Sequence, residues 1–261
     1  MKRKDLLDAL TKLYPTIASN PIVEEMSCFR FDGDFLRASD GMTMVQTKAP
    51  EGLNLDCLVP ATKFYKLIST IPDDEITLTL TDDSVLKVKA GKKTARYKVF
   101  TEGGMLDNLP LEPDAWVEVP ENLMRNLATC KFAASTDASR GAMCGVQVTN
   151  GHIIATDVFR IARMPLNAEI DPLVIPINLI TLATKHTITH WATKADVIYF
   201  KTADDTIVAG KTILGDFPDA AGYLKQIEEL EQTIEMPAEV DASLKRHLDQ
   251  QTDVLGLDKE V

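Results

Sequence analysis

The chain has 261 residues, of which 45% are hydrophobic and 26% charged, and its net charge is −11. At roughly 100–200 residues per domain, this length predicts about two domains with cores of their own, and it excludes a mini-protein or a wholly disordered chain. No apolar run approaches the roughly 18 residues that cross a bilayer, and the N-terminus lacks the apolar stretch of a secretory signal. We therefore expect a cytoplasmic protein that contacts no membrane.

The sequence repeats itself at an offset of 116–117 residues. The matching segments are LRASDG with IIATDV, CLVPATKFYKLI with LVIPINLITLAT, and WVEVPENLMRNLATC with TIEMPAEVDASLKRH. The repeat predicts two domains, residues 1–114 and 115–227. Residues 228–261 are too few to bury a core, so they are either the start of an incomplete third copy or an acidic tail.

The elements of the first copy follow from the spacing of apolar residues and from turn residues. Apolar residues at helical spacing predict a helix over 2–14, and Asp32-Gly33 predicts the turn of a β-hairpin. Pro60 then opens a second helix over 61–70, because a first-turn proline leaves no hydrogen bond unmade. The alternation that is typical of strands resumes around Asp82-Asp83.

The second copy follows the same order. It predicts a helix over 121–131, a hairpin turn at Asn150-Gly151 and a helix over 177–186 that Pro176 opens. Strand-like alternation resumes around Asp204-Asp205. Each copy is therefore helix, strands, helix, strands, which predicts an α+β fold with the helices on one face of antiparallel sheets.

The predicted helices are basic although the whole chain is acidic. They hold nine basic and three acidic side chains, a charge of +6, so everything outside them totals −17. A helical layer of Lys and Arg without amide or aromatic readers attracts phosphates but does not read bases. The alternative is that these side chains only keep exposed helix faces in solution. The candidate phosphate-binding residues of the helices are Lys2, Arg3, Lys4, Lys12, Lys63, Lys66, Arg125, Lys131 and Lys185.

Two segments resemble a known family. FAASTDASRGAMCGVQVTNGHIIATDVFRIA (132–162) is similar to the second-domain signature of bacterial DNA polymerase III beta sliding clamps, and GKTILGDFPDAAGYL (210–224) is similar to the stretch that closes that domain. The resemblance extends over residues 5–225. It implies tandem clamp domains in a ring that slides on double-stranded DNA and tethers the replicative DNA polymerase. It also implies a clamp-loader ATPase as a partner and self-association into a dimer or a trimer.

The resemblance also implies site residues. Arg140 matches a basic residue near DNA, and a structural ion pair is its alternative role. Val158-Phe159 stands where the family usually has Gly-His, and Asn20-Pro21 stands where Arg-Pro is common. A pocket for a hydrophobic partner peptide maps to Met143, Thr156, Val158, Phe159, Arg160, Ile161, Pro218 and Tyr223, each of which could instead be a core residue.

Other classes of function find less support. The sequence has no nucleophile elbow, Walker loop or Rossmann fingerprint, so we predict no enzyme, no catalytic residue and no cofactor. Asp40 and Asp157 recur between the copies, where capping of a turn suits them better than catalysis. His186 and His190 are four residues apart, but poor helix formers separate them and no third ligand is evident, so we predict no metal.

The four cysteines are expected to be reduced and buried. The main alternative is a clamp-fold scaffold, or a monomeric processivity module, that does not encircle DNA.

Overall fold

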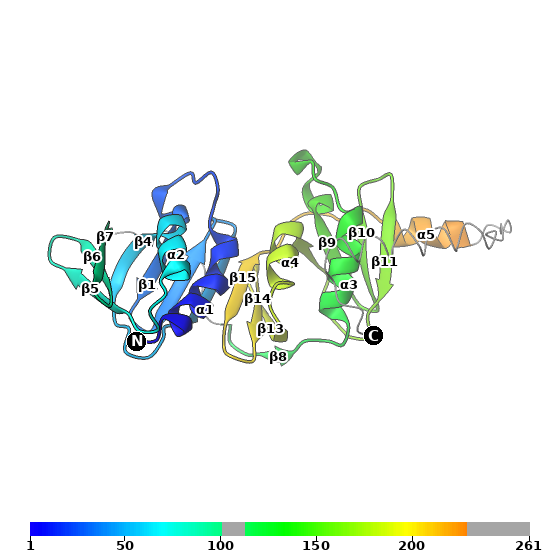
Figure 1. Cartoon of the computed structure of the whole chain (residues 1–261). Helices are drawn as coiled ribbons and strands as arrows, with labels where there is room; N and C mark the ends of the chain where they lie inside the picture. The colour runs from blue at the N-terminus through cyan, green and yellow to red at the C-terminus, as the bar shows by residue number, and fades with distance from the viewer. Residues whose placement is uncertain (101–112, 229–261) are drawn as a thin grey trace, which may run out of the picture. The chain divides into compact units, whose positions relative to one another are not determined.

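The computed structural model describes residues 1–100 and 113–228 (Figure 1). The chain divides into one unit, Met1–Ala220, and a second unit that starts at Ala221, of which helix α5 (Ala220–Glu228) is described. The first half of the first unit contains α1 (Arg3–Leu13), β1 (Cys28–Asp32), β2 (Phe35–Ser39), β3 (Thr43–Lys48), β4 (Asp56–Pro60), α2 (Ala61–Thr70), β5 (Thr77–Thr81), β6 (Val85–Ala90) and β7 (Lys93–Lys98). The second half contains β8 (Val117–Glu118), α3 (Leu123–Cys130), β9 (Gly145–Thr149), β10 (His152–Thr156), β11 (Ile161–Pro165), β12 (Leu173–Pro176), α4 (Ile177–Ala183), β13 (Ile188–Lys194), β14 (Val197–Thr202) and β15 (Ile207–Lys211).

The predicted α+β class is confirmed. All pairings between these strands are antiparallel. The four predicted helices are present as α1 to α4, and Pro60 and Pro176 are the N-cap residues of α2 and α4. Helix α4 ends at Ala183, earlier than predicted, because the β-branched residues that follow lead into β13. None of the described helices is long and apolar enough to cross a bilayer.

The sequence repeat is visible in the register of the strands. Phe35 of β2 pairs with Lys48 of β3, and His152 of β10 pairs with Pro165 of β11, so both partners are displaced by the same 117 positions. The two predicted hairpin turns are present, with Gly33 at φ +55° and Gly151 at φ +81°. Positive φ angles are accessible to glycine at little steric cost, which explains why both turns hold one.

The two acidic turn pairs lie at different points of the repeat. Asp82-Asp83 lies between β5 and β6, whereas Asp204-Asp205 lies between β14 and β15. The counterpart of the first turn in the second copy is Ala195-Asp196, between β13 and β14. Pairs of turn residues therefore predict correctly where a hairpin lies. They do not show which hairpin of one copy corresponds to which hairpin of the other.

One sheet spans both halves of the first unit. Its strand order is β4-β1-β2-β3-β15-β14-β13-β8, and two smaller sheets have the orders β11-β10-β9-β12 and β5-β6-β7. At the junction Val45 of β3 pairs with Val208 of β15, and both belong to the main core with Leu10 of α1 and Leu179 of α4. Because paired residues point to the same face of a sheet, helices from both halves cover the same face (Figure 1).

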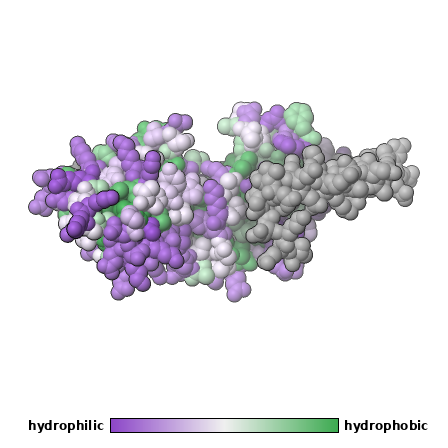
Figure 2. Space-filling model, viewed as in Figure 1, coloured by the Kyte–Doolittle hydropathy of each residue, from purple (hydrophilic) through white to green (hydrophobic). Residues whose placement is uncertain are grey.

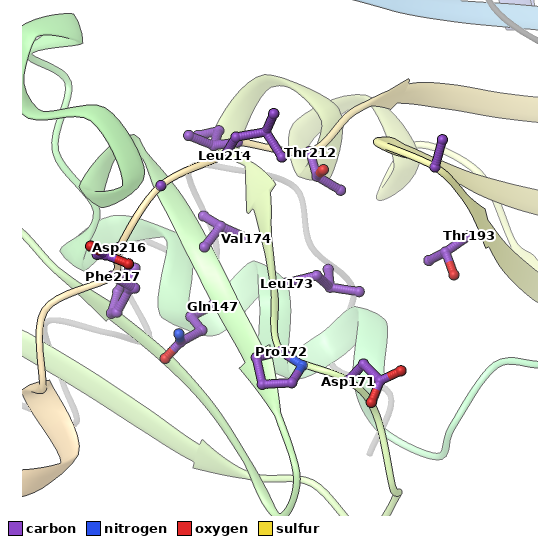
Figure 3. Close-up of a pocket in the computed structure, with 13 residues that line it drawn as sticks. Gln147, Asp171, Pro172, Leu173, Val174, Thr193, Thr212, Leu214, Asp216 and Phe217 are labelled. Atoms are coloured by element: carbon purple, nitrogen blue, oxygen red, sulfur yellow. The ribbon is translucent and has the colours of Figure 1, made fainter.

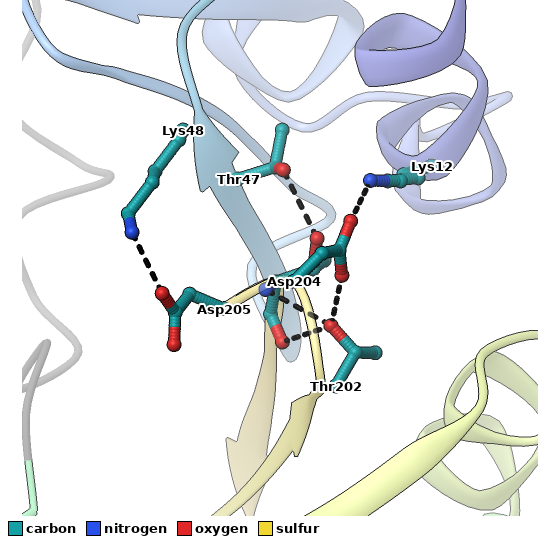
Figure 4. Close-up of polar contacts among 7 residues, drawn as sticks. Lys12, Thr47, Lys48, Thr202, Asp204 and Asp205 are labelled. Atoms are coloured by element: carbon teal, nitrogen blue, oxygen red, sulfur yellow. Dashed lines mark hydrogen bonds and ion pairs between the residues drawn. The ribbon is translucent and has the colours of Figure 1, made fainter.

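Side chains from three elements surround the β14–β15 turn at this junction (Figure 4). The hydroxyl groups of Thr47 on β3 and Thr206 are buried and lie 3.0 Å apart in a hydrogen bond. Lys48 Nζ donates to Asp205 Oδ2 at 2.6 Å. The turn is therefore tied to the first half through β3.

Helix α1 also contacts this turn. Lys12 forms an ion pair with Asp204, and the hydroxyl of Thr202 donates to the same carboxylate (Figure 4). The hydrogen bonds from Lys12 and Thr202 hold the pKa of Asp204 well below its usual range. The carboxylate is therefore ionised in the folded chain at neutral pH.

Three of the four cysteines are buried, as predicted, and Cys144 is only half-buried. All four are free thiols. Desolvation by burial raises the pKa of Cys28, Cys57 and Cys130 to about 11. These three thiols are consequently protonated and unreactive at neutral pH.

We expect the double substitution Asp204→Asn and Asp205→Asn to weaken the junction in a pH-dependent way. Both carboxylates have a lowered pKa in the folded chain, so their stabilisation is fully present above the unfolded value of about 3.9 and is lost as pH falls through the lower folded value. Because the ion pairs are partly exposed, each contributes no more than about 1 kcal/mol at pH 7. Urea unfolding between pH 7 and pH 2 measures the difference from wild type.

The matched control is Asp83→Asn, an exposed turn residue that has no ion pair with the described residues. Its stability difference from wild type should be small and constant across the same range. A double variant whose deficit does not shrink toward low pH would contradict the assignment.

Candidate nucleic-acid interface and docking patch

The helices of the first unit form a layer that exposes basic side chains. Helix α1 packs beside α2, and α3 packs beside α4, above the shared core. Within residues 1–100 and 113–228, six of the predicted cations are exposed and have no ion pair. They are Lys2, Lys4, Lys63, Lys66, Arg125 and Lys185.

The other four predicted cations have partners in the protein. Arg3 Nη1 donates to the carbonyl of Ile68 at 3.3 Å, and Lys12 is paired with Asp204 as described above. Lys131 Nζ lies 3.5 Å from the hydroxyl of Thr181, which links α3 to α4. The fourth, Arg140, has its Nε 3.9 Å from Asp137 Oδ2, so the ion pair expected as its alternative role is present, and it also donates to the β10–β11 turn. These four side chains hold parts of the fold together, and the six exposed ones are available to a ligand.

The repeated aspartates cap turns, as predicted. In the first copy Asp40 Oδ1 accepts from the backbone N–H groups of Met42 and Thr43 at 2.9 and 2.7 Å. In the second copy Asp157 Oδ1 accepts from Phe159 and Arg160, both at 3.0 Å. These equivalent bonds make the two turns copies of one structure.

The second-copy turn holds its aspartate more tightly. Arg160 Nε donates to Asp157 Oδ2 at 2.8 Å. Partial desolvation favours the neutral acid, but the hydrogen bonds from Arg160 and Phe159 outweigh it and lower the pKa of Asp157. Asp157 is therefore an anion that orders its own turn.

Val158 is strained in this turn. Its φ is +81°, and Gly41, 117 positions earlier, has a φ of +88° at the same point of the first-copy turn. A β-branched residue adopts a positive φ only at an energetic penalty, whereas glycine adopts it readily. The second copy therefore keeps an apolar side chain at a position that the first copy fills with glycine.

The strained turn carries an exposed aromatic–arginine patch, formed by Val158, Phe159, Arg140, Phe132 and Arg160. The side chain of Phe159 is 86% exposed, and the guanidinium of Arg140 lies 5.8 Å from its ring centroid. Arg160 stands 5.8 Å from the ring of Phe132 in the same way. Arg140 Nη1 also donates to the carbonyl of Asp157 at 3.0 Å, so it is anchored to the turn. Exposed phenylalanine flanked by arginine is typical of protein-docking surfaces.

The remaining predicted pocket residues differ in exposure. Thr156 is buried, with its hydroxyl donating to the carbonyl of Arg160, whereas Met143, Ile161 and Pro218 are half-buried. Tyr223 is exposed on α5, which belongs to the second unit. The structure thus brings Thr156, Val158, Phe159, Arg160 and Ile161 together on one turn, and the prediction that Pro218 and Tyr223 complete a pocket with them stays a prediction.

A cavity that the sequence analysis missed lies beside β12. Its volume is about 650 Å³, and it is lined by β12, the β13–β14 turn and residues 212–217 (Figure 3). Leu173, Val174 and Phe217 give it an apolar wall, and the carboxylates of Asp171 and Asp216 lie at its edge. Such a site suits a short segment with apolar and basic side chains. The sequence offers one signal for it, the apolar Leu214 beside Gly215. In the structure the side chain of Leu214 is 75% exposed.

The two histidines do not share a helix. His186 follows α4, and His190 lies in β13. Among residues 1–100 and 113–228, no three His, Cys, Asp or Glu side chains gather in a way that could hold a metal ion.

Comparison with known proteins identifies the fold. No protein-family model matches the chain, and no curated protein matches it. Solved structures do: the DNA polymerase sliding clamp from Bacillus subtilis superposes with a TM-score of 0.71 at 16% identity over 85% of this chain and 66% of that one. The fold is that of the bacterial sliding clamps.

Other sliding clamps match equally well. The beta subunit of the DNA polymerase of Streptococcus pyogenes gives a TM-score of 0.71 at 19% identity over 90% of this chain and 68% of that one. The clamp from Caulobacter crescentus gives 0.70 at 22% identity, over 85% and 66%. The chain thus spans about two thirds of the length of these clamps.

We expect Val158→Gly to stabilise the protein. Relief of the positive φ outweighs the extra freedom that glycine has in the unfolded chain, so the free energy of unfolding should rise by about 1 kcal/mol. Urea unfolding measures it. Val158→Ala is the control, because it removes the exposed methyl groups and keeps the strained backbone; it should leave stability nearly unchanged. Equal effects of the two substitutions would rule out backbone strain as the cause.

Proposed function

We propose that this chain acts as a DNA sliding clamp: copies of it form a ring around duplex DNA, hold the replicative polymerase there and perform no chemistry. The observation that carries the proposal is the sliding-clamp fold combined with six exposed cations, four on helices α1 to α3 and two, Lys2 and Lys185, beside the ends of α1 and α4. Lysine and arginine without base-reading neighbours bind phosphates of any sequence, which is what movement along DNA requires. A clamp-loader ATPase would open the ring, and the protein would act in the cytoplasm.

The sheet edges support ring closure. Strand β11 occupies the same place in the second copy as β3 in the first, and β7 occupies the same place as β15. Within the chain β3 pairs with β15. Their counterparts β11 and β7 end their sheets without a partner strand among the described residues. Pairing of β11 in one copy with β7 in the next would repeat the internal junction, and repeated head-to-tail junctions close into rings.

The domain boundaries belong to this proposal. Residues 1–114 and 115–227 are proposed to be two clamp domains, and residues 228–261 to begin a third domain or to form an acidic tail; most of that last segment lies outside the described residues. A ring of six domains takes three copies of a two-domain chain or two copies of a three-domain chain.

The aromatic–arginine patch is the proposed contact for the polymerase. Its exposed Phe159 offers an apolar anchor, and the guanidinium groups of Arg140 and Arg160, whose charges are already paired within the protein, offer flat faces to an aromatic neighbour in a partner peptide. Val158 makes this surface bulkier than a glycine turn would. A peptide with a side chain that packs across Phe159, and not one that inserts beneath it, therefore suits the patch.

A specific observation favours the alternative of a clamp-fold scaffold that does not encircle DNA. Both free edges are basic: β7 exposes Lys93, Arg96 and Lys98, and β11 exposes Arg163. Like charges oppose pairing of the two edges, and charged residues on edge strands are a known way to prevent association.

Retention on circular DNA separates the two functions. We expect light scattering with mass determination to show an oligomer of the 28.8 kDa chain, and we expect this oligomer to stay on nicked circular DNA and to leave linear DNA by its ends. A monomer that leaves both DNA forms equally would support the scaffold. Arg163→Glu serves as the matched variant, because it places an acid opposite the basic β7 edge and should raise the oligomeric fraction.

Neutralising the exposed helix cations should weaken DNA binding and its salt dependence together. Each lost phosphate contact lowers the slope of log K against log salt by about 0.9, so Lys4→Gln, Lys63→Gln, Lys66→Gln and Arg125→Gln combined should lower it by up to about 4. Titration of labelled duplex at several salt concentrations measures this.

The matched pair of single variants is Lys66→Gln and Lys12→Gln. Lys66 is exposed and should lower the slope by about 1, whereas Lys12 is paired with Asp204 and should leave it unchanged. Identical slopes for wild type and the fourfold variant would exclude the helical layer as the DNA-binding surface.

A further inference from the structure

The β6–β7 hairpin is strongly basic although it lies outside the helices. Residues 85–98 contain six cations and no acid. They are Lys87, Lys89, Lys92, Lys93, Arg96 and Lys98. The residues outside the predicted helices total −17, and this hairpin is a positive exception within that negative sum.

Four of these six cations, Lys87, Lys89, Arg96 and Lys98, lie on one face of the sheet β5-β6-β7. Leu86, Val88 and Ala90 belong to the core, and Ala95 and Tyr97 pack against it, so the residues between them point away from the core. We call this side the outer basic face. It consists of Thr77, Thr79, Thr81, Val85, Lys87, Lys89, Thr94, Arg96 and Lys98. Figure 2 shows hydrophilic side chains over the end of the unit where Figure 1 places these strands.

The outer basic face is separate from the helical layer. Tyr97, on the opposite side of the same sheet, donates a hydrogen bond to the carbonyl of Lys63 in α2 at 3.4 Å. The helix thus packs against one side of the sheet while Lys87, Lys89 and Arg96 stand on the other. A ligand of the outer face does not compete for the helix cations.

The arrangement of these cations opposes the stability of the sheet. Lys87 lies directly opposite Arg96 in the register, and none of the cations on this face has an ion pair with the described residues. Like charges in opposite positions destabilise a pair of strands. Protection of a free edge explains charges on β7, but β6 is the central strand, so Lys87 and Lys89 protect no edge. Binding of an anionic ligand would offset the repulsion between these cations and so stabilise the sheet.

The chemistry of the face indicates which anion. It has no aromatic or amide side chain and only Val85 as an apolar one, so it lacks the apolar centre of a protein interface and the aromatic rings on which unpaired bases stack. Lysine, arginine and threonine are the side chains that bind phosphate oxygens. Lys87 and Lys89 are about 6.8 Å apart along their strand, and the neighbouring strand adds Arg96 at about 4.8 Å. We propose that the outer basic face binds the phosphate backbone of a nucleic-acid strand, without base specificity, as a second site apart from the helical layer.

Two triple variants with the same change of charge test the second site. The outer variant is Lys87→Gln, Lys89→Gln and Arg96→Gln, and the helix-layer variant is Lys63→Gln, Lys66→Gln and Arg125→Gln. The probes are fluorescent oligo(dT) of about 20 nucleotides and a duplex of the same length, titrated with the full chain at several salt concentrations. We expect the outer variant to bind at least one probe about tenfold more weakly, with a salt slope lower by about 2–3. Loss with oligo(dT) alone assigns the site to single strands, and loss with the duplex assigns it to double strands.

Thermal denaturation checks that weaker binding is not caused by unfolding of the outer variant. Because the variant removes the repulsion between Lys87 and Arg96, its unfolding midpoint should be equal to or above that of wild type. An outer variant that binds both probes as wild type does overturns the second site, whatever the helix-layer variant does. If only the helix-layer variant binds as wild type, the proposed DNA-facing layer fails and the second site stands. Poly-glutamate serves as a third probe. If the outer variant alone loses binding of poly-glutamate and still binds both nucleic-acid probes as wild type does, the ligand of this face is an acidic protein and the proposal is wrong.

Discussion

The antiparallel pairing of β3 with β15 is the constraint on which the rest of the first unit depends. It joins residues 161 to 167 positions apart into one eight-stranded sheet and buries Val45 against Val208 in the common core. Since a sheet has only two faces, this single pairing decides that α1 and α4 cover the same side. The polar contacts of Thr47 with Thr206, and of Lys48 with Asp205, then fix the end of the junction.

The same pairing explains which cations are free. From the sequence, Lys12 is predicted to be a phosphate-binding lysine on a helix. In the fold, however, the β14–β15 turn places Asp204, 192 positions away in the sequence, next to it. Lys63 and Lys66 on α2 are exposed and have no ion pair with the described residues. A basic side chain is available to a ligand only where the fold supplies no acid. Within the described residues this holds for the helical layer and for the outer basic face, which carry the two proposed nucleic-acid contacts.

The turns at Asp40 and Asp157 show how one repeated structure diverges. Both aspartates accept from the backbone two and three residues later, and both following residues have positive φ angles. The first copy satisfies this geometry with Gly41, whereas the second keeps Val158 and exposes Phe159 beside it. Local strain of this kind is tolerated where surrounding bonds hold the turn in place, and it is common at functional surfaces. The second-copy turn is therefore the one that exposes apolar side chains, and it is the turn that we propose for docking.

The sequence by itself determined the local parts of this protein. Apolar spacing, the prolines before α2 and α4 and the glycines at φ +55° and +81° act within a few residues of one another, so they predicted the helices, the hairpins and the capping aspartates correctly. Only the tertiary structure decided the β3–β15 junction, the pairing of Lys12 with Asp204, the cavity beside β12 and the gathering of Lys87, Lys89 and Arg96 on one face. The physical reason is distance along the chain or across strands: these features depend on which strand edges meet and on which side a strand buries, and neither is specified by the residues next to them.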